Sequence, residues 1–475
     1  MAALGVAAAA TGRHAAAVRD FEAAARQAAL AKEPELEAAV RELSRRAALL
    51  LEQAQAKGRF CKGPAWLQTE PLPEAVLPSG WEAWARAMPR TAEHAGPVEV
   101  RWAGRRGLFA ARAVSAGEIL LAAWPVAWAE SSGEPLVLEL QRAGRASSLA
   151  CGRLECLADG SDVQVMLPLE SVNRLLLLSE DEPPPEERAR RRHAASLRGA
   201  VRTNAFRTST SGSAAVYGLP SMLNHSCDGW EASVLRHIRD DGTMIFWAAR
   251  DIAEGEELYG RYFACEGPLH VRRECSGSWG FACGCRRCAF EEARLPPSRP
   301  GALVEAALTA WRERLCPQMK SLGSAACGEL LPQLLEATAA VESAAASEAE
   351  WGELEVAWCL ALVQPLSMAA LWCLMAGKGP AAGGPCPSQA ASPQLRCEVL
   401  GRTVKAWACS EGLGPDHLRS ALLLWSAARE LGAEASDARR LCEHLFHIRF
   451  GVLPEELRLG APDSPVEGLL RRLRR

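Results

Sequence analysis

Three short motifs follow one another in the middle of the chain: NHSC at 224–227, GEELYGRY at 255–262 and WGFACGCRRC at 279–288. Around them, residues 201–290 consist of short apolar runs broken by glycine and polar residues, which is typical of short β-strands. The earlier stretch GRRGLFAARAVSAGEIL at 104–120 has the same character. The sequence therefore predicts a β-rich core that is assembled from two separate parts of the chain.

The last of these motifs carries the strongest metal-binding signal in the chain. Cys283, Cys285 and Cys288 have the spacing CxCxxC, which puts three thiols on one tight loop. Residues 1–26 lack the basic start and leucine-rich core of a secretory signal, so we expect reduced thiols and a metal site rather than a disulfide. A structural zinc site is closed by four ligands in a tetrahedron, so a fourth ligand is required. The local candidates for it are Cys227, Cys265 and Cys275.

Helical patterns occupy much of the remaining chain. Apolar residues recur at helical spacing within 13–54, which predicts a helical hairpin in the N-terminal region. We also expect a helical insert at 131–200 and helices from 296 to 475. The predicted strands therefore lie between helical segments.

The uncharged run at 356–377 has the length and composition of a membrane-spanning helix. Gln364, Pro365 and Ser367 interrupt it, and a proline removes a hydrogen bond from a helix interior. We therefore predict two buried helices that part near Pro365, and no membrane association.

The composition is that of an ordinary folded chain. Of the 475 residues, 49% are hydrophobic and 23% are charged, and the formal net charge is −3. These values exclude a disordered or collagen-like chain and give no bulk attraction to nucleic acid. Tyrosine is scarce, because the chain has only three: Tyr217, Tyr259 and Tyr262.

In this order and spacing, the glycine-rich stretch, NHSC, GEELYGRY and the cysteine loop resemble SET-domain protein lysine methyltransferases with a post-SET loop. They are most similar to the SMYD (SET and MYND) group, over 97–130 and 200–290. The resemblance implies an α+β fold: a β-rich SET domain of small sheets with a pseudoknot, a helical insert, an N-terminal helical hairpin and an α-helical C-terminal domain. The expected domains are an N-terminal helical region at 1–95, the SET domain at 96–265, the post-SET zinc loop at 266–290 and the helical domain at 296–475.

The same resemblance implies roles for individual residues. Tyr262 stands at the position of the catalytic tyrosine, and Cys227 at that of the zinc ligand that joins Cys283, Cys285 and Cys288. The implied cofactors are S-adenosyl-L-methionine and a structural Zn²⁺. The positions that would contact S-adenosylmethionine are Gly104, Arg105, Arg106, Asn204, Asn224, His225, Tyr262 and Phe281.

These residue types suit methyl transfer to an amine. A lysine side chain has a pKa of about 10.4 and attacks only as the neutral amine, so the site must favour deprotonation by desolvation and by a nearby sulfonium. A tyrosine hydroxyl can orient that amine, and alignment supplies much of the rate. We expect an enzyme, a protein-lysine N-methyltransferase that acts on a histone or non-histone protein. It would be a monomer in the cytoplasm or nucleus, without direct contact to nucleic acid or membrane.

The sequence also departs from the SMYD pattern. It lacks the cysteines and histidines of a MYND finger, and Arg105 stands where a glycine is frequent. NHSC is followed by Asp228-Gly229-Trp230 in place of x-Pro-Asn. Trp279 stands where a tyrosine is common, and tryptophan offers only an N–H donor. A second hypothesis is therefore a catalytically impaired SET-fold scaffold that binds peptides or chromatin. A third is a methyltransferase for a non-lysine or small-molecule amine.

Overall fold

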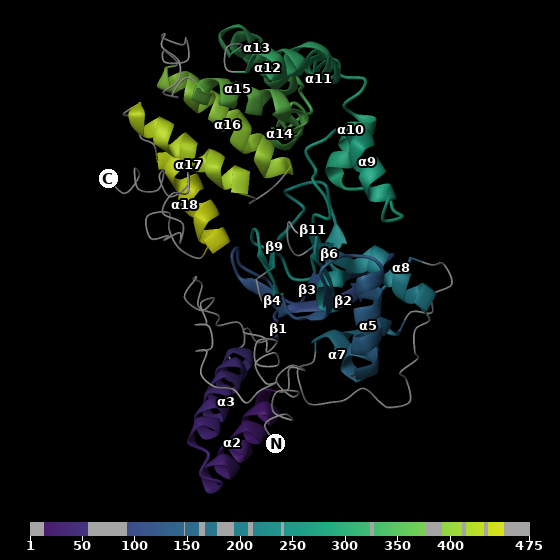
Figure 1. Cartoon of the computed structure of the whole chain (residues 1–475). Coiled ribbons are helices and arrows are strands. Elements are labelled where there is room, and N and C mark those ends of the chain that lie inside the picture. The colour runs from purple at the N-terminus through teal and green to yellow at the C-terminus, as the bar shows by residue number, and fades with distance from the viewer. Residues whose placement is uncertain are drawn as a thin grey trace. The chain divides into compact units, whose positions relative to one another are not determined.

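The computed structural model shows an α+β chain that divides into two compact units (Figure 1). The first unit comprises Met1–Asn224 and Val234–Leu258, and the second comprises His225–Ser233 and Tyr259–Arg475. The chain thus passes between the units three times: inside NHSC, after Ser233 and inside GEELYGRY. The structure describes residues 14–55, 93–146, 148–160, 167–177, 194–207, 212–238, 242–323, 327–376, 392–410, 415–431 and 436–450.

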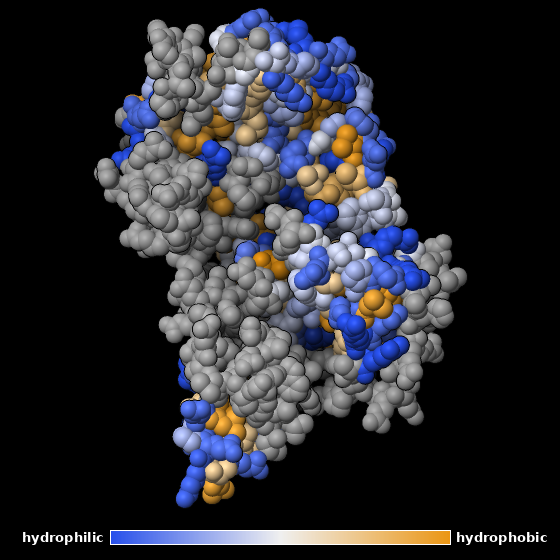
Figure 2. All heavy atoms as spheres, in the orientation of Figure 1, coloured by the Kyte–Doolittle hydropathy of each residue, from blue (hydrophilic) through white to orange (hydrophobic). Residues whose placement is uncertain are grey.

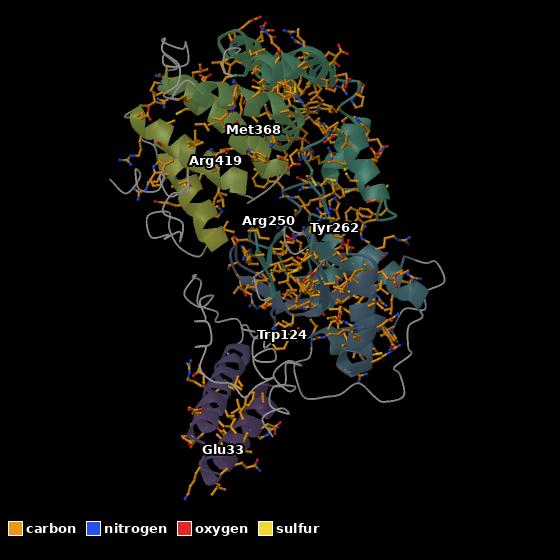
Figure 3. All side chains as sticks on the ribbon, in the orientation of Figure 1. Glu33, Trp124, Arg250, Tyr262, Met368 and Arg419 are labelled. Carbon is orange, nitrogen blue, oxygen red and sulfur yellow. The ribbon has the colours of Figure 1, made fainter. Side chains whose placement is uncertain are left out.

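The N-terminal helices form a hairpin, in which α2 (His14–Leu30) packs against α3 (Pro34–Gln55). Proline suits the first position of α3, because the N–H that it lacks has no partner in a first helical turn. Phe21 and Leu43 are fully buried in the hairpin. Figure 2 shows both hydrophilic and hydrophobic side chains on its outer face, and Figure 3 labels Glu33 at the turn. Residues 1–13 and 56–92 of the predicted N-terminal region lie outside the described residues.

Three small sheets form the β-rich part of the chain, with strand orders β1-β4-β10-β9, β2-β3-β11-β8 and β5-β7-β6. In the second sheet, β3 pairs antiparallel with both β2 and β11. The first sheet contains β1 (His94–Ala95), β4 (Ile119–Ala123), β10 (Met244–Ala248) and β9 (Val234–Ile238). The second contains β2 (Val98–Trp102), β3 (Arg106–Ala110), β11 (Glu257–Gly260) and β8 (Asn224–His225). The third contains β5 (Pro125–Ala129), β7 (Ala214–Tyr217) and β6 (Ala205–Arg207).

Short helices pack on these sheets within the first unit. Helix α5 contacts β5 and α7 contacts β2, and α7 buries Val172 and Leu176 on its inner face. The helices are α5 (Glu134–Ala146), α6 (Ser148–Glu155), α7 (Leu169–Leu177), α8 (Ala194–Asn204) and the 3₁₀ turn η3 (Leu219–Met222).

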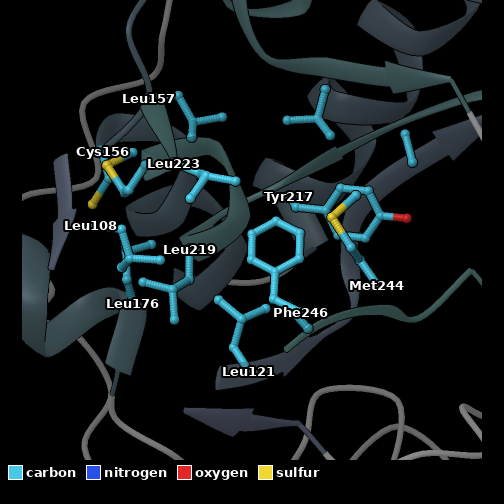
Figure 4. Packing of buried hydrophobic residues seen from close by; sticks show 14 of the residues in the cluster. Leu108, Leu121, Cys156, Leu157, Leu176, Tyr217, Leu219, Leu223, Met244 and Phe246 are labelled. Carbon is cyan, nitrogen blue, oxygen red and sulfur yellow. The ribbon is translucent and has the colours of Figure 1, made fainter. Parts of the chain in front are cut away.

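Sheets and helices share one apolar core in the first unit (Figure 4). Strands β3 and β4 are apolar on both faces, which is why Leu108, Leu120 and Leu121 are fully buried. Tyr217 is also buried there, and its hydroxyl donates to the carbonyl oxygen of Gly242 at 2.7 Å. Tyr217 is therefore a core residue.

The second unit is helical, and three of its helices pack side by side, α16 against α14 and α17 (Figure 1). Its smaller elements are α9 (Leu269–Gly277), α10 (Arg286–Ala293), α11 (Arg299–Ala310), the π-helical turn η4 (Trp311–Leu315) and α12 (Cys316–Leu322). The others are α13 (Cys327–Ser347), α14 (Glu353–Leu362), α15 (Gln364–Ala376), α16 (Pro393–Ser410), α17 (Pro415–Glu430) and α18 (Ser436–Phe450).

The uncharged run at 356–377 forms α14 and α15, which part at Val363 and are bent by 71°. Trp358, Leu360 and Leu366 of these helices are buried. The prediction of two buried helices is therefore confirmed. Among the described residues, no single helix is long and apolar enough to cross a membrane, and this bent pair meets the criterion by length and composition alone.

Candidate active site and metal centre

Four cysteines of the second unit come together, because the sulfur atoms of Cys227, Cys283, Cys285 and Cys288 all lie within 4.8 Å of one another. Local sequence explains the loop: Cys285 is the N-cap of α10, so Cys288 falls in the first turn of that helix, where its N–H approaches the Cys285 sulfur at 3.5 Å. Cys227 comes from NHSC. The structure thus groups the cysteine that the resemblance implies with the three of the loop.

The chemistry of this donor set fits zinc. With a Zn–S bond of about 2.3 Å, a tetrahedral site needs sulfur atoms about 3.8 Å apart, which the observed spread allows. Hydrogen bonds among the thiols lower the pKa of Cys283 and raise the pKa of Cys227, so the cluster shares protons that a bound zinc ion would displace. Cys265 belongs to a second group, with His225 and Cys227.

Buried arginines surround the cysteines with positive charge. Arg272 donates to the sulfur of Cys288 at 3.6 Å and pairs with Glu291 at 2.9 Å. Arg287 pairs with the same carboxylate at 2.7 Å. Burial is the largest effect and acts to lower the pKa of Arg272, but the Glu291 carboxylate and the sulfur atoms of Cys288 and Cys227 together outweigh it and raise that pKa. Two fixed cations beside four thiolates favour a closed metal site, since a zinc ion with four thiolates carries net negative charge.

His225 links the cysteine cluster to Tyr262. Its Nδ1 accepts a hydrogen bond from the backbone N–H of Tyr262 at 3.1 Å, and its Nε2 lies 3.2 Å from the sulfur of Cys227. Because Nδ1 accepts, the neutral ring carries its proton on Nε2, which donates to that sulfur. Both ring nitrogens are therefore engaged within the protein, so the ring holds Tyr262 and Cys227 in place.

Aromatic rings surround the His225 imidazole. His225 stacks on Phe263 with ring centroids 4.4 Å apart, and Tyr262, which Figure 3 labels, lies 5.2 Å from His225. Phe281 and Trp279 each lie 6.0 Å from the Tyr262 ring. Three of the implied site residues, His225, Tyr262 and Phe281, are thus in contact, and Trp279 joins them.

In the first unit, Asn224 connects the strands that carry two other motifs. Its Nδ2 donates to the carbonyl oxygen of Arg106 at 2.8 Å and to the carboxylate of Glu257 at 2.7 Å. Gly107 is required beside it, because a Cβ there would lie 2.5 Å from that carboxylate. Glu257 was not among the predicted site residues, although its place in GEELYGRY was a signal for it.

The guanidinium of Arg106 has a structural role. It donates to the carbonyl oxygens of Cys156 at 2.8 Å and Leu167 at 3.0 Å, which ties β3 to the helical insert. Gly104 and Arg105 are exposed in the turn before β3, and Gly104 has a φ of 74°, which favours glycine.

Asn204 ends α8 and is held apart from this network. Its Nδ2 donates to the carbonyl oxygens of Ala158 at 2.6 Å and Ala200 at 2.8 Å. Its amide keeps a carbonyl oxygen as a further acceptor, and so does that of Asn224. Such acceptors, with the exposed backbone of Gly104 and Arg105, suit the ammonium and other polar groups of an amino-acid-like ligand.

Comparison with known proteins supports one family. A family model described as the SET domain matches residues 105–263. Among curated proteins, the chain is 37% identical over 91 residues to "Histone-lysine N-methyltransferase SET5" of Scheffersomyces stipitis, 18% of each chain. It is 42% identical over 72 residues to the protein of that name from Meyerozyma guilliermondii, 15% of each chain. The matches therefore span less than a fifth of those relatives. The family match and the three small sheets together support a SET domain at residues 105–263 of this chain.

Proposed function

We propose that this chain is a protein-lysine N-methyltransferase of SMYD-like type, which uses S-adenosylmethionine and carries a four-cysteine zinc centre next to its catalytic tyrosine, Tyr262. One observation carries the proposal: His225 joins the Tyr262 backbone, at 3.1 Å, to Cys227 of the cysteine cluster, at 3.2 Å. The SET-domain match, which includes both NHSC and Tyr262, supports it.

S-adenosylmethionine, when bound, supplies an electrophilic methyl group on a sulfonium. The aromatic side chains of Tyr262, Phe281 and Trp279 give the amine of a substrate lysine an apolar surrounding, which disfavours its charged form. The Tyr262 hydroxyl orients the neutral amine. Transfer would leave the cofactor as the thioether S-adenosylhomocysteine, and the methylated amine would release its proton to solvent.

The four cysteines Cys227, Cys283, Cys285 and Cys288 would hold the zinc. Its role here is structural, because four protein ligands leave no open position for substrate. Zinc would fix the loop that carries Phe281 and Trp279 against the segment that carries Tyr262. Loss of metal is therefore expected to reduce activity as well as order.

The proposed substrate is a lysine of a histone or other protein. The named activity of the similar yeast proteins supports this class. The net charge of −3 gives no bulk attraction to nucleic acid. The proposed location is the cytoplasm or the nucleus.

Methyl transfer from labelled S-adenosylmethionine to core histones, and to a proteome extract, tests the proposal. We expect labelled lysine with the full chain and a loss of about a hundredfold or more with Tyr262→Phe, the scale of losing the alignment of the reacting atoms. Tyr259→Phe, in β11, is the matched control and should retain activity. Transfer at the full rate by Tyr262→Phe would contradict the assignment.

Trp279 favours a second candidate, a SET-fold scaffold that binds peptides without efficient methyl transfer. Its ring lies 6.0 Å from Tyr262, at a position where the SMYD pattern commonly has a tyrosine hydroxyl. Calorimetry with S-adenosylmethionine and S-adenosylhomocysteine separates the candidates, since an enzyme must bind both. Binding of a histone-tail peptide without either of them would favour the scaffold.

A further inference from the structure

The carboxyl end of α16 meets three segments of the second unit that carry site residues. The carbonyl oxygen of Cys409 accepts from the Gly229 N–H at 2.9 Å and from Nη1 of Arg287 at 3.5 Å. The carbonyl oxygen of Ser410, the last residue of α16, accepts from Nη1 of Arg261 at 2.6 Å. The last carbonyl groups of a helix have no partner inside it, so all three donors satisfy oxygens that α16 cannot.

Each donor lies beside a residue of the proposed site. Gly229 follows Cys227 by two residues, and Arg261 directly precedes Tyr262. Arg287 lies in α10 next to the zinc-ligand candidate Cys288. Three segments that are separate in sequence are therefore fixed to one helix end.

The contact at Gly229 is close enough to require glycine. A Cβ at this position would lie 2.1 Å from the carbonyl oxygen of Ala408, which is backbone and cannot move aside cheaply. The neighbouring Asp228 is fully buried, and its Oδ1 accepts from the indole N–H of Trp358 in α14 at 3.2 Å. The unusual Asp-Gly sequence after NHSC thus has a physical reason, since it docks this turn against the C-terminal helices.

Charge strengthens the same contact. A helix carries partial negative charge at its carboxyl end, and the guanidinium groups of Arg261 and Arg287 bring positive charge to it. Arg287 is fully buried and also donates to the carbonyl oxygen of Cys265 at 2.9 Å. Arg261 is half-buried, so its removal leaves a smaller defect in packing.

We infer that the carboxyl end of α16 is a positioning element of the active site, and that Arg261 is a positioning residue that acts through Tyr262. The expected effect on kcat rests on the proposed function, whereas the expected effect on amide exchange does not. The end of α16 then holds the segment that carries Tyr262, and hydrogen exchange at the Gly229 and Tyr262 amides measures how firmly that segment is held.

The test compares Arg261→Ala and Arg261→Lys in the full chain. Arg261→Ala should lower kcat for a histone substrate about tenfold or more, the effect of losing a charged hydrogen-bond donor, and leave KM within about twofold. Amide exchange at Gly229 and Tyr262 should accelerate by a similar factor, while bound zinc stays at one equivalent. Arg261→Lys keeps a cation and a donor and should recover most of both losses. Arg294→Ala removes a comparable donor to a backbone carbonyl, Glu350 at 3.2 Å, and should behave as the unaltered protein.

A second variant keeps the inference testable if Arg261→Ala does not fold. Gly229→Ala should accelerate amide hydrogen exchange at Tyr262. Gly401→Ala, which lies in α16 and has open space around its Cα, should not. Unchanged exchange at Tyr262 in Gly229→Ala, or at both amides in a folded Arg261→Ala, overturns the inference. If the unaltered protein methylates nothing, the proposed function fails, but the exchange results still decide the positioning role.

Discussion

The imidazole of His225 joins Tyr262 to Cys227: Nδ1 accepts from the Tyr262 N–H at 3.1 Å, and Nε2 lies 3.2 Å from the Cys227 sulfur. A residue that the family resemblance placed at the cofactor therefore has its ring nitrogens committed to the protein. The His225 ring therefore connects Cys227 of the cysteine cluster to the backbone of Tyr262, the proposed catalytic tyrosine.

Replacing His225 should uncouple Tyr262 from the cysteine cluster. His225→Ala removes an acceptor and a donor together with a stacked ring, so kcat for lysine methylation should fall by at least about tenfold, as for loss of two hydrogen bonds. Steady-state kinetics with a histone substrate measure this. His270→Ala, at an exposed position in α9, is the control and should keep its kcat. An equal rate for both variants would contradict the role of His225.

The cysteine cluster should bind one zinc ion. We expect one equivalent of zinc in the purified chain by elemental analysis, and almost none in Cys283→Ser, because a closed site loses much of its affinity with one ligand. Cys275→Ser should keep its zinc, since Cys275 lies outside both cysteine groups that the described residues form. Chelation should also lower the melting temperature. A metal-free protein with an unchanged melting temperature would rule the site out.

Glu291 should be essential for the stability of the second unit. It stands between Arg272 and Arg287, whose side chains are 1% and 0% exposed, so Glu291→Gln deprives two buried cations of the carboxylate that they share. The free energy of unfolding should fall by about 3–5 kcal/mol, which denaturant titration measures. The neighbour Glu292 pairs with Arg273 on the surface, and Glu292→Gln should change little. Comparable effects of the two substitutions would show that the buried trio has no special role.

Two helical cysteines should resist alkylation. Burial raises the pKa of the Cys359 and Cys409 thiols to about 12, from an ordinary value of 9.0. Both therefore stay protonated at pH 8.5, and iodoacetamide should leave them unlabelled in the native protein, as peptide mass spectrometry would show. Half-buried Cys316 should react.

The raised pKa values of Cys359 and Cys409 also predict that the free energy of unfolding decreases at alkaline pH. Between pH 9 and 12 the unfolded chain releases protons that the native thiols keep, so the unfolded state gains stability as the pH rises. The free energy of unfolding should then decrease by up to about 1.4 kcal/mol per pH unit for each thiol. Stability that is constant to pH 11 would show that these thiols ionise in the native state.

Much of the local structure could be predicted from the sequence. The break near Pro365 and the α-helical start at Pro34 follow from how proline acts on helical hydrogen bonds. The three loop cysteines could be predicted as one group because CxCxxC spans less than two helical turns. The motif GEELYGRY offered Glu256 and Glu257 as candidates, but it could not show that Asn224 donates to Glu257.

The sequence by itself determined the helical segments and the cysteine loop, because periodicity and motif spacing act over a few residues, while its resemblance to SET-domain enzymes implied the α+β class and the candidate tyrosine. Only the tertiary structure decided that His225 turns its ring toward Cys227, that Arg272 and Arg287 share Glu291, and that the end of α16 receives Gly229 and Arg261. The physical reason is that a hydrogen bond between Gly229 and Cys409 depends on how whole helices pack. A local sequence pattern does not indicate to which distant carbonyl oxygen a backbone N–H will donate.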